Sequence, residues 1–481
     1  MTTDPAEEAE MLERAGDSAS AAAHHDEADA FMSQAVELYH QLGDRPGIVR
    51  TTAALGRVLL SPFRTQKALA YLEPAAQEFA DLGDDRGFVE LLSQLARAYM
   101  LNEEPGRSIE AADRAIEAAE RADYVEIVAD TLITKGTSLA SIRRPYEGVA
   151  LIEGGIRLAE ENGLTSTLLR GKINRSGSLI EADPRAGLES TRPGYFESQR
   201  LGLRRRAMVF LMNSAEASFA VGDWDWALPE LEDWLAGDLE PEDRISMLSP
   251  MIQFRSWRGE DVAALLEEAS RLAERAPDPS SQFSEVVNRG IVGFAQGDLR
   301  GAADEFRHAA GISLGNAATT FAMAARAALL ARDAAGATAD LAAYDRAGWH
   351  GPYVEARRAE IRAGIAALEG RPAEALGLYA DALRRFRDLG VQLDAAFTSI
   401  EMATLLDPSL PEVIAAAEAG RATLVRLGAR PFIERLDAAL ARTAEGGASS
   451  GSEPEGFEPE SSGAVSTTPR KASRNTAAKA G

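Results

Sequence analysis

The chain repeats itself at an interval of 40 residues. The segment LGDRPGIVRTTAALGRVLL begins at Leu42, and LGDDRGFVELLSQLARAYM begins at Leu82. After each Leu-Gly pair, apolar residues return every three or four positions, which places them on one face of a helix. A single pair of helices of this length cannot bury its apolar face alone, so successive copies must stack on one another. The sequence therefore predicts an elongated helical array.

The second helix of each copy has a small, a larger and another small residue at positions i, i+4 and i+7. The four N-terminal sets are Ala28, Met32 and Ala35; Ala68, Leu72 and Ala75; Ser108, Ala112 and Ala115; and Gly148, Ile152 and Gly155. On the first helix of the third copy, Gly136 occupies the position of Gly56 and Ala96. Small residues at these positions allow two helix backbones to come close. Gly43, Gly83 and Gly163 follow the last apolar residue of their helices, as C-caps require.

This small–large–small pattern resembles the second helix of the tetratricopeptide repeat (TPR). The best copies are Ala302-x3-Phe306-x2-Ala309 and Ala375-x3-Tyr379-x2-Ala382. The first helix lacks the usual opening Trp, and the period is about 40 residues rather than about 34. Arrays of this longer period resemble those that follow the ATPase module in large bacterial transcription activators and nucleotide cyclases, and RLGARPFIERLDAAL, from Arg426, resembles how such arrays end. The resemblance implies an all-α fold: a right-handed α-solenoid of ten or eleven TPR-like helix pairs with a concave inner face.

Composition and pattern divide the chain into four segments. Residues 1–183 are expected to form regular N-terminal TPR-like repeats, and residues 261–443 the C-terminal ones. In residues 184–260, Pro184, Pro193 and Gly194 are expected to interrupt a helix, which predicts an irregular Trp-rich junction. Residues 444–481 are rich in Ser, Gly, Glu and Pro. They cannot bury enough apolar surface to offset chain entropy, so we expect a disordered tail.

The junction segment also concentrates tryptophans and includes three consecutive arginines. Four of the five tryptophans lie there: Trp224, Trp226, Trp234 and Trp257. These rings either fill an irregular junction core or form an aromatic cluster that faces a ligand. Arg204, Arg205 and Arg206 either bind an anion or an acidic partner, or form a solvated helix face with salt bridges to nearby acids.

The charge balance restricts the classes of partner. The chain has 75 Asp and Glu against 51 Lys and Arg, a net charge of −24. Nucleic-acid binding needs a basic footprint, so we expect no direct nucleic-acid partner. No apolar run approaches the roughly 18 residues of a membrane span, and we expect no membrane association. The start, MTTDPAEEAE, is acidic and unlike a secretory signal, which favours a cytoplasmic location.

Sequence motifs for catalysis or cofactor binding are not found. The chain has no cysteine, which excludes disulfides, thiol catalysis and zinc thiolate sites. Its five histidines show no metal-binding spacing. Gly171-Lys172 resembles the end of a phosphate loop, but Ser166 stands where the first glycine is needed. We therefore expect no catalytic residue, no metal, no cofactor and no enzyme activity.

Charged positions on the first helices are candidate binding residues, because the resemblance implies that these helices line the concave groove. Two sets recur at 40-residue intervals: Arg57 and Arg97, and Arg50, Glu90, Asp130 and Arg170. A charged groove selects an extended ligand of opposite charge. The other interpretation is that these arginines bridge neighbouring acids within the array.

Two functions are consistent with this pattern. The first is a non-catalytic scaffold or regulatory sensor that binds a protein segment or a small effector in the groove. The second, implied by the resemblance, is the effector-sensing half of an ATPase-type transcription regulator or nucleotide cyclase whose catalytic part is missing from this chain. With either function, we expect a protein or peptide partner, and a small effector is a further possible ligand.

The composition of residues 444–481 leads to a first prediction. Limited proteolysis should remove this segment first and leave a stable core, because an unfolded segment is open to proteases. Mass spectrometry of the digestion products measures where cleavage occurs. Cleavage that starts inside residues 1–443, with the segment intact, would contradict the prediction.

Overall fold

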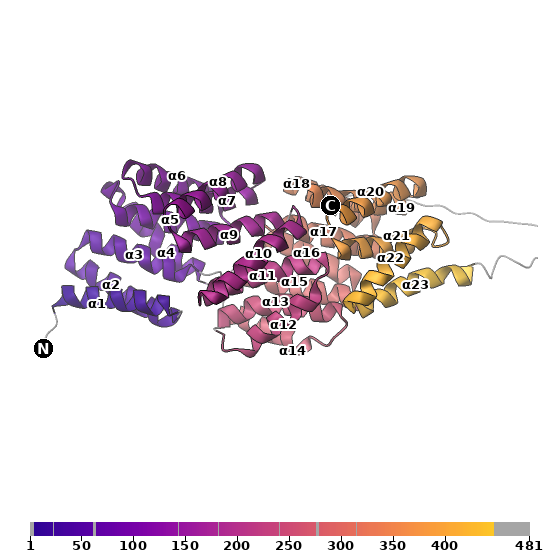
Figure 1. Cartoon of the computed structure of the whole chain (residues 1–481), viewed down its shortest axis with the longest axis horizontal. Coiled ribbons are helices and arrows are strands. Elements are labelled where there is room, and N and C mark those ends of the chain that lie inside the picture. Colours follow the sequence, from indigo (N-terminus) through magenta and orange to yellow (C-terminus); the bar gives the residue numbers. More distant parts are fainter. Residues whose placement is uncertain are drawn as a thin grey trace, which may run out of the picture.

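The computed structural model of the chain describes residues 4–22, 24–60, 64–142, 144–180, 182–239, 241–275, 279–313 and 315–446. Within these ranges the protein is all-α, with 23 α-helices, one short 3-10 helix and no strand. The predicted fold class, an α-solenoid of TPR-like helix pairs, is confirmed. Figure 1 shows α1–α4 at one end of the molecule and α20–α23 at the other.

The helices follow one another with short connections. Their bounds are α1 Pro5–Ala21, α2 His25–Leu42, α3 Arg45–Leu59, α4 Thr65–Glu78, η1 Ala80–Leu82, α5 Arg86–Leu101, α6 Pro105–Arg121, α7 Val125–Ser141, α8 Pro145–Glu161, α9 Thr165–Ile180, α10 Pro184–Arg200, α11 Arg204–Val221, α12 Trp224–Ala236, α13 Pro241–Trp257, α14 Ala263–Arg275, α15 Pro279–Gln296, α16 Leu299–Ile312, α17 Ala317–Leu330, α18 Ala334–Ala347, α19 Pro352–Leu368, α20 Pro372–Asp388, α21 Gln392–Leu405, α22 Pro411–Leu427 and α23 Arg430–Gly446.

Odd-numbered helices are the first helices of the pairs, and even-numbered helices are the second. Successive odd helices contact one another from α1 through α15, and again from α17 through α23. The odd helices begin at intervals that run from 35 residues, between Ala317 and Pro352, to 41 residues, between Arg45 and Arg86. The described chain thus forms eleven pairs followed by α23.

The small–large–small pattern packs as the sequence predicts. In the N-terminal sets, Met32, Leu72 and Ile152 are fully buried, and the small residues that flank them are buried too. The same holds for the downstream copies around Phe306 and Tyr379. Met32, Leu72, Ile152 and Phe306 pack against a glycine on the first helix of their own pair, so the repeat pattern and the core coincide.

The fourth helix pair, α7 and α8, shows the close backbone approach that the pattern predicts. A Cβ atom added to Gly136 of α7 would lie 2.5 Å from the carbonyl oxygen of Gly148 on α8. The reverse substitution would place a Cβ atom on Gly148 2.5 Å from the carbonyl oxygen of Gly136. No real Cβ atom tolerates that distance, so glycine is required on both helices.

The predicted interruption at Pro193 and Gly194 is wrong. Helix α10 begins at Pro184 and continues through both residues to Arg200. A proline inside a helix removes one hydrogen bond to the carbonyl four residues earlier, and that residue, Glu189, is exposed to water. Gly194 has a packing role, because a Cβ atom there would lie 2.4 Å from the ring of Phe210. Helix pairs therefore continue through residues 184–260, and the four-segment division stays a prediction.

The C-terminal pairs fold back against the middle of the chain. Helix α21 contacts α11 and α17, and α23 contacts α13 and α15. Nη1 of Arg426 donates to the carbonyl oxygen of Gly222 at 2.9 Å, across 204 residues of sequence. The backbone amide of Tyr353 donates to the carbonyl oxygen of Ala182 at 3.2 Å. Residues from the end of α9 to α23 thus form a closed turn of the solenoid.

Tryptophans of the junction segment lie at the centre of this closed turn. The ring of Trp257 lies 5.0 Å from that of Phe397 and 5.0 Å from that of Phe432, measured between centroids. Trp224 is stacked on Phe219 at 5.3 Å. Both tryptophans are fully buried, and the other two pack against the same core. Of the two interpretations, that of rings filling a junction core holds for Trp224 and Trp257.

Two further predictions concern the C-terminal tail and membrane-spanning segments. The predicted tail begins at residue 444, but α23 extends to Gly446; residues 447–481 lie outside the described part of the chain. None of the helices in the described ranges is both long and apolar enough to cross a membrane.

The glycine contact between α7 and α8 yields a second prediction. Gly148→Ala should lower the free energy of unfolding by about 1–3 kcal/mol, because a methyl group would force two backbones apart. Gly154→Ala on the same helix is the control. Nothing lies within 4 Å of its added Cβ atom, so alanine should stabilise the helix by about 0.5–1 kcal/mol. Urea unfolding measures both changes, and equal effects at the two positions would contradict the prediction.

Candidate binding site on the inner face

Four arginines and one aspartate lie on four consecutive first helices. Arg97 lies on α5, Arg170 on α9, and Arg205 and Arg206 on α11, while Asp130 lies on the intervening helix α7. We call these five residues the arginine cluster. Helices α5, α7, α9 and α11 contact one another in series, so the cluster follows the stack of first helices.

Arg97 is an uncompensated cation within the cluster. Its side chain is half-buried, and it makes no hydrogen bond or ion pair with any residue that the structure describes. Loss of water contact lowers the pKa of Arg97 to about 9, and repulsion from Arg170, Arg205 and Arg206 adds to this effect. Asp130 acts in the opposite direction but does not offset them. The protein thus holds a positive charge at a place where nothing described neutralises it.

Asp130 is already engaged by Arg170. Nε of Arg170 donates to Oδ1 of Asp130 at 2.8 Å, and Nη1 donates to Oγ1 of Thr134 at 3.2 Å. Arg170 is only 5% exposed. Because this carboxylate is paired with Arg170, the other three guanidinium groups of the cluster are left without an ion-pair partner in the described structure.

The three consecutive arginines of α11 do not form the salt-bridged surface that was one of the two interpretations. Arg204 donates to the carbonyl oxygen of Asp238, and Arg206 donates to the hydroxyl of Ser166. Arg205 has neither a hydrogen bond nor an ion pair in the described ranges. Burial lowers the pKa of Arg206, with repulsion from Arg170 as a further cause. The alternative, that these residues bind an anion or an acidic partner, stays a prediction.

The remaining predicted groove residues are engaged within the array. Arg57 pairs with Glu90 and lies 3.7 Å from Asp17. Arg50 donates from Nε to Glu13 at 2.8 Å and from Nη2 to the same carboxylate at 2.9 Å. These two arginines bridge neighbouring acids, which was the second interpretation of the set. Of the six predicted residues, the structure brings Arg97, Asp130 and Arg170 together in the arginine cluster.

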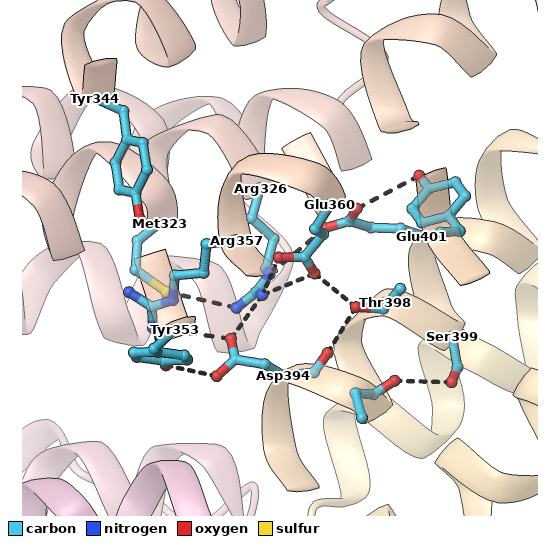
Figure 2. Close-up of polar contacts among 12 residues, drawn as sticks. Met323, Arg326, Tyr344, Tyr353, Arg357, Glu360, Asp394, Thr398, Ser399 and Glu401 are labelled. Atoms are coloured by element: carbon cyan, nitrogen blue, oxygen red, sulfur yellow. Dashed lines mark hydrogen bonds and ion pairs between the residues drawn. The ribbon is translucent and has the colours of Figure 1, made fainter. Parts of the chain in front are cut away.

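The C-terminal pairs contain a buried ionic network that the sequence did not predict. Figure 2 shows Arg326 of α17 between Glu360 of α19 and Asp394 of α21. Nη2 of Arg326 lies 2.7 Å from Oε2 of Glu360 and 2.7 Å from Oδ1 of Asp394. These three residues are spaced 34 positions apart along the sequence. A charge that recurs at that interval on apolar first helices is the signal that would have found them.

Three further residues complete the network. The hydroxyl of Tyr353 donates to Oδ2 of Asp394 at 2.7 Å, and Arg357 donates to that hydroxyl. Oε1 of Glu401 lies 3.5 Å from Nε of Arg326. The network therefore joins three successive first helices, α17, α19 and α21, through their buried faces.

The carboxylates of the network differ in protonation. Burial raises the pKa of Glu401 well above its usual range, and the nearby charge of Glu360 raises it further. Burial would also raise the pKa of Asp394, but Arg357 and Arg326 outweigh it and hold the pKa below its usual range. Asp394 therefore stays ionised to lower pH than an ordinary carboxyl group, and Glu401 stays protonated to higher pH. The network is a structural clamp, and nothing in its geometry requires a metal ion.

The protonation of Glu401 yields a third prediction. In the unfolded chain this carboxyl ionises near its ordinary pKa of 4.5, whereas the folded protein keeps it protonated to higher pH. Its contribution to stability is complete below that value and falls by about 1.4 kcal/mol per pH unit above it, until the folded pKa is reached. Glu401→Gln removes this loss, so the variant should gain stability relative to the wild type as pH rises above about 5.

Urea unfolding at several pH values between 5 and 8 measures this difference. The exposed Glu418 of α22 is the control position, and Glu418→Gln should show no such dependence on pH. A stability difference for Glu401→Gln that moves in the wild type's favour as pH rises would show that the folded protein holds this carboxyl ionised.

Comparisons with known proteins find similarity only at a low level. A scan against family models and a search of curated proteins both find no match. Among solved structures, the anaphase-promoting complex hetero-tetramer Cut9–Hcn1 matches with 10% identity and a TM-score of 0.48, covering 91% of this chain and 90% of that one. Yeast Tom70 matches with 12% identity and a TM-score of 0.25, covering 92% and 90%. Naa15/Naa10 bound to HypK-THB matches with 12% identity and a TM-score of 0.23, covering 91% and 89%. Similarity at this level carries no functional argument.

Proposed function

We propose that the chain is a non-catalytic interaction scaffold or sensor whose inner face binds an acidic protein segment at the arginine cluster. The observation that supports this most directly is Arg97, a half-buried cation without an ion-pair partner in the described ranges. Arg170, Arg205 and Arg206 surround it, with one carboxylate among them. The cluster is locally cationic in a chain whose net charge is −24.

An anion would relieve the repulsion among these arginines. Guanidinium groups recognise carboxylates and phosphates through paired N–H donors, which are stronger than neutral hydrogen bonds. Each such contact contributes about 1.5–3 kcal/mol when it is shielded from water, and much less when exposed. Because Arg97, Arg205 and Arg206 are all half-buried, contacts here fall between these two limits.

The arrangement favours an extended ligand. The cluster is distributed over α5, α7, α9 and α11, and neighbouring helices in a stack lie about 10 Å apart. A single small anion reaches one or two of these helices, whereas an extended acidic segment contacts several of them. Concave surfaces built from stacked helix pairs suit such segments.

The second hypothesis is that the chain senses an effector on behalf of a separate ATPase or nucleotide cyclase. It requires a catalytic partner protein, whereas the scaffold proposal requires only an acidic segment. Co-purification from native extract with an enzyme of either class would favour the second hypothesis. Binding of an acidic peptide by the purified chain would favour the first.

The test of the proposed function uses a fluorescein-labelled peptide of ten glutamates and measures its binding by fluorescence anisotropy. Replacing Arg97 and Arg205 together with Gln should weaken binding at least tenfold, because two unpaired cations are lost. The melting temperature should stay the same or rise, because the substitution removes repulsion and breaks no ion pair. A peptide of ten lysines should not bind the wild type.

A second double variant serves as the matched control. Arg114 on α6 and Arg157 on α8 are exposed and make no ion pair in the described ranges. Replacing both with Gln changes the net charge equally but on second helices, so binding should be retained. If both double variants lost the same affinity for the glutamate peptide, the loss would be due to the change in net charge and not to the arginine cluster. A lower melting temperature with unchanged affinity would assign Arg97 and Arg205 to the fold instead.

A further inference from the structure

The closed turn of the solenoid surrounds a cavity of about 460 Å³. Most of its lining residues come from five first helices, α11, α13, α15, α17 and α19, and Ile180 at the end of α9 adds to them. The volume lies within the range of about 300–1,000 Å³ that is typical of sites for small organic ligands. The arginine cluster contributes no residue to this lining, so the cavity is a separate feature of the inner face.

The cavity wall contains buried polar atoms that lack a partner. Asn288 is 1% exposed, and its Nδ2 donates to Ser249 at 3.1 Å, but its Oδ1 accepts no hydrogen bond. Arg357 is 9% exposed, and its Nε makes no hydrogen bond although Nη2 donates to Tyr353. Buried polar groups are nearly always paired in folded proteins, so each such atom calls for an explanation. Here one atom needs a donor and the other needs an acceptor.

The rest of the lining combines apolar surface with hydroxyl and amide groups. Met212, Phe283, Val287 and Met323 supply apolar side chains from three different helices. Serine, threonine and asparagine side chains from α11, α13, α15 and α17 stand among them. Mainly apolar walls with a few placed polar groups are characteristic of sites that bind small organic molecules.

The charges at the wall disfavour a charged ligand. Arg357 is the one cation in the lining, and Oδ1 of Asp394 lies 3.8 Å from its Nη2. Glu103 and Glu216 add carboxylates to the lining. An anion would meet these carboxylates, and a cation would meet Arg357. A hydroxyl or a primary amide can both donate and accept, which is what Asn288 and Arg357 together need.

We propose that this cavity is a second binding site, specific for an uncharged, mainly apolar organic molecule with hydroxyl, carbonyl or amide groups. The proposal goes beyond the acidic-segment function and does not depend on it. The two sites differ in the charge of their ligands: the arginine cluster takes an anion, and the cavity takes a neutral molecule.

The site also has a structural connection to the rest of the array. Oγ of Ser313 donates to Oε1 of Glu103 at 3.2 Å, across 210 residues of sequence. Both residues line the cavity, and Glu103 lies in the turn after α5, the helix that contains Arg97. A molecule in the cavity would therefore touch the closed turn and the N-terminal pairs at the same time.

The test uses prodan, an uncharged naphthyl ketone whose emission shifts to the blue in apolar surroundings. The full-length protein should bind prodan at a single saturable site, with a blue shift. Ser284 lines the cavity from α15 and makes no hydrogen bond in the described ranges. Ser284→Phe should fill part of the cavity and weaken binding at least tenfold.

Gln282, exposed on the same helix, is the control position. Gln282→Phe adds an identical ring outside the cavity and should leave prodan binding unchanged. Hydrogen–deuterium exchange of the wild type provides a test that needs no variant: prodan should protect α11, α13, α15, α17 and α19. No saturable binding, equal effects of the two phenylalanines, or protection confined to α1–α9 would each overturn the proposal.

Two cross-measurements separate this site from the arginine cluster. The variant with Gln at positions 97 and 205 should bind prodan as the wild type does. Ser284→Phe should bind the glutamate peptide as the wild type does. If the glutamate peptide fails to bind but prodan behaves as expected, the proposed function fails and the cavity site stands. If the glutamate peptide binds as expected but prodan does not, the cavity site fails and the proposed function stands.

Discussion

The structure depends on the close approach of two helix backbones within each pair. On the second helix, a small residue precedes and another follows a larger side chain. The small residues allow the second helix to pack closely against the first. Where both helices have glycine at the contact, as at Gly136 and Gly148, the backbones themselves meet. This packing leaves the outer faces of each pair apolar, and only a neighbouring pair can cover them. The solenoid, its curvature and the position of its inner face all follow from that requirement.

The charges of the molecule are distributed in two different ways. Many surface acids are paired with arginines of the neighbouring helix, as in the contact between Arg50 and Glu13. Deep in the C-terminal pairs, Arg326 is surrounded by carboxylates that compensate its charge. Arg97 belongs to neither group, because the nearest carboxylate is occupied by Arg170. An uncompensated charge costs free energy in the absence of a ligand, and this cost is the physical basis of the proposed binding at the arginine cluster.

The sequence predicts those features that depend on neighbours close along the chain. Buried sets such as Ala68, Leu72 and Ala75 follow from helical spacing, because the period of a helix is a local property. Arg97 and Arg170 were found because equivalent positions recur every 40 residues. The convergence of Arg97 with Arg205 and Arg206 was not predictable, since it depends on how several helix pairs accumulate curvature.

The same limit applies to the other missed features. The network around Arg326 forms only where the faces of three first helices are buried together, and the cavity forms only inside the closed turn. Both therefore depend on contacts between residues that are far apart in the sequence. Pro193 does not break α10 because the carbonyl that loses its hydrogen bond, on Glu189, is exposed to water. Gly194 is small because the ring of Phe210 lies against it, and this contact cannot be predicted from the local sequence.

The closed turn has a consequence for how the molecule unfolds. In an open repeat array each unit contacts only its neighbours, so stability is a sum of local terms and unfolding can proceed from either end. Here Arg430 donates to the carbonyl oxygens of Arg258 and Gly259, across more than 170 residues of sequence. Loss of α23 therefore removes contacts from α13 and α15 as well as from α21. The segment from the end of α9 to α23 should behave as one cooperative unit with slow, non-local folding, while the N-terminal pairs retain the linear cooperativity of an open array.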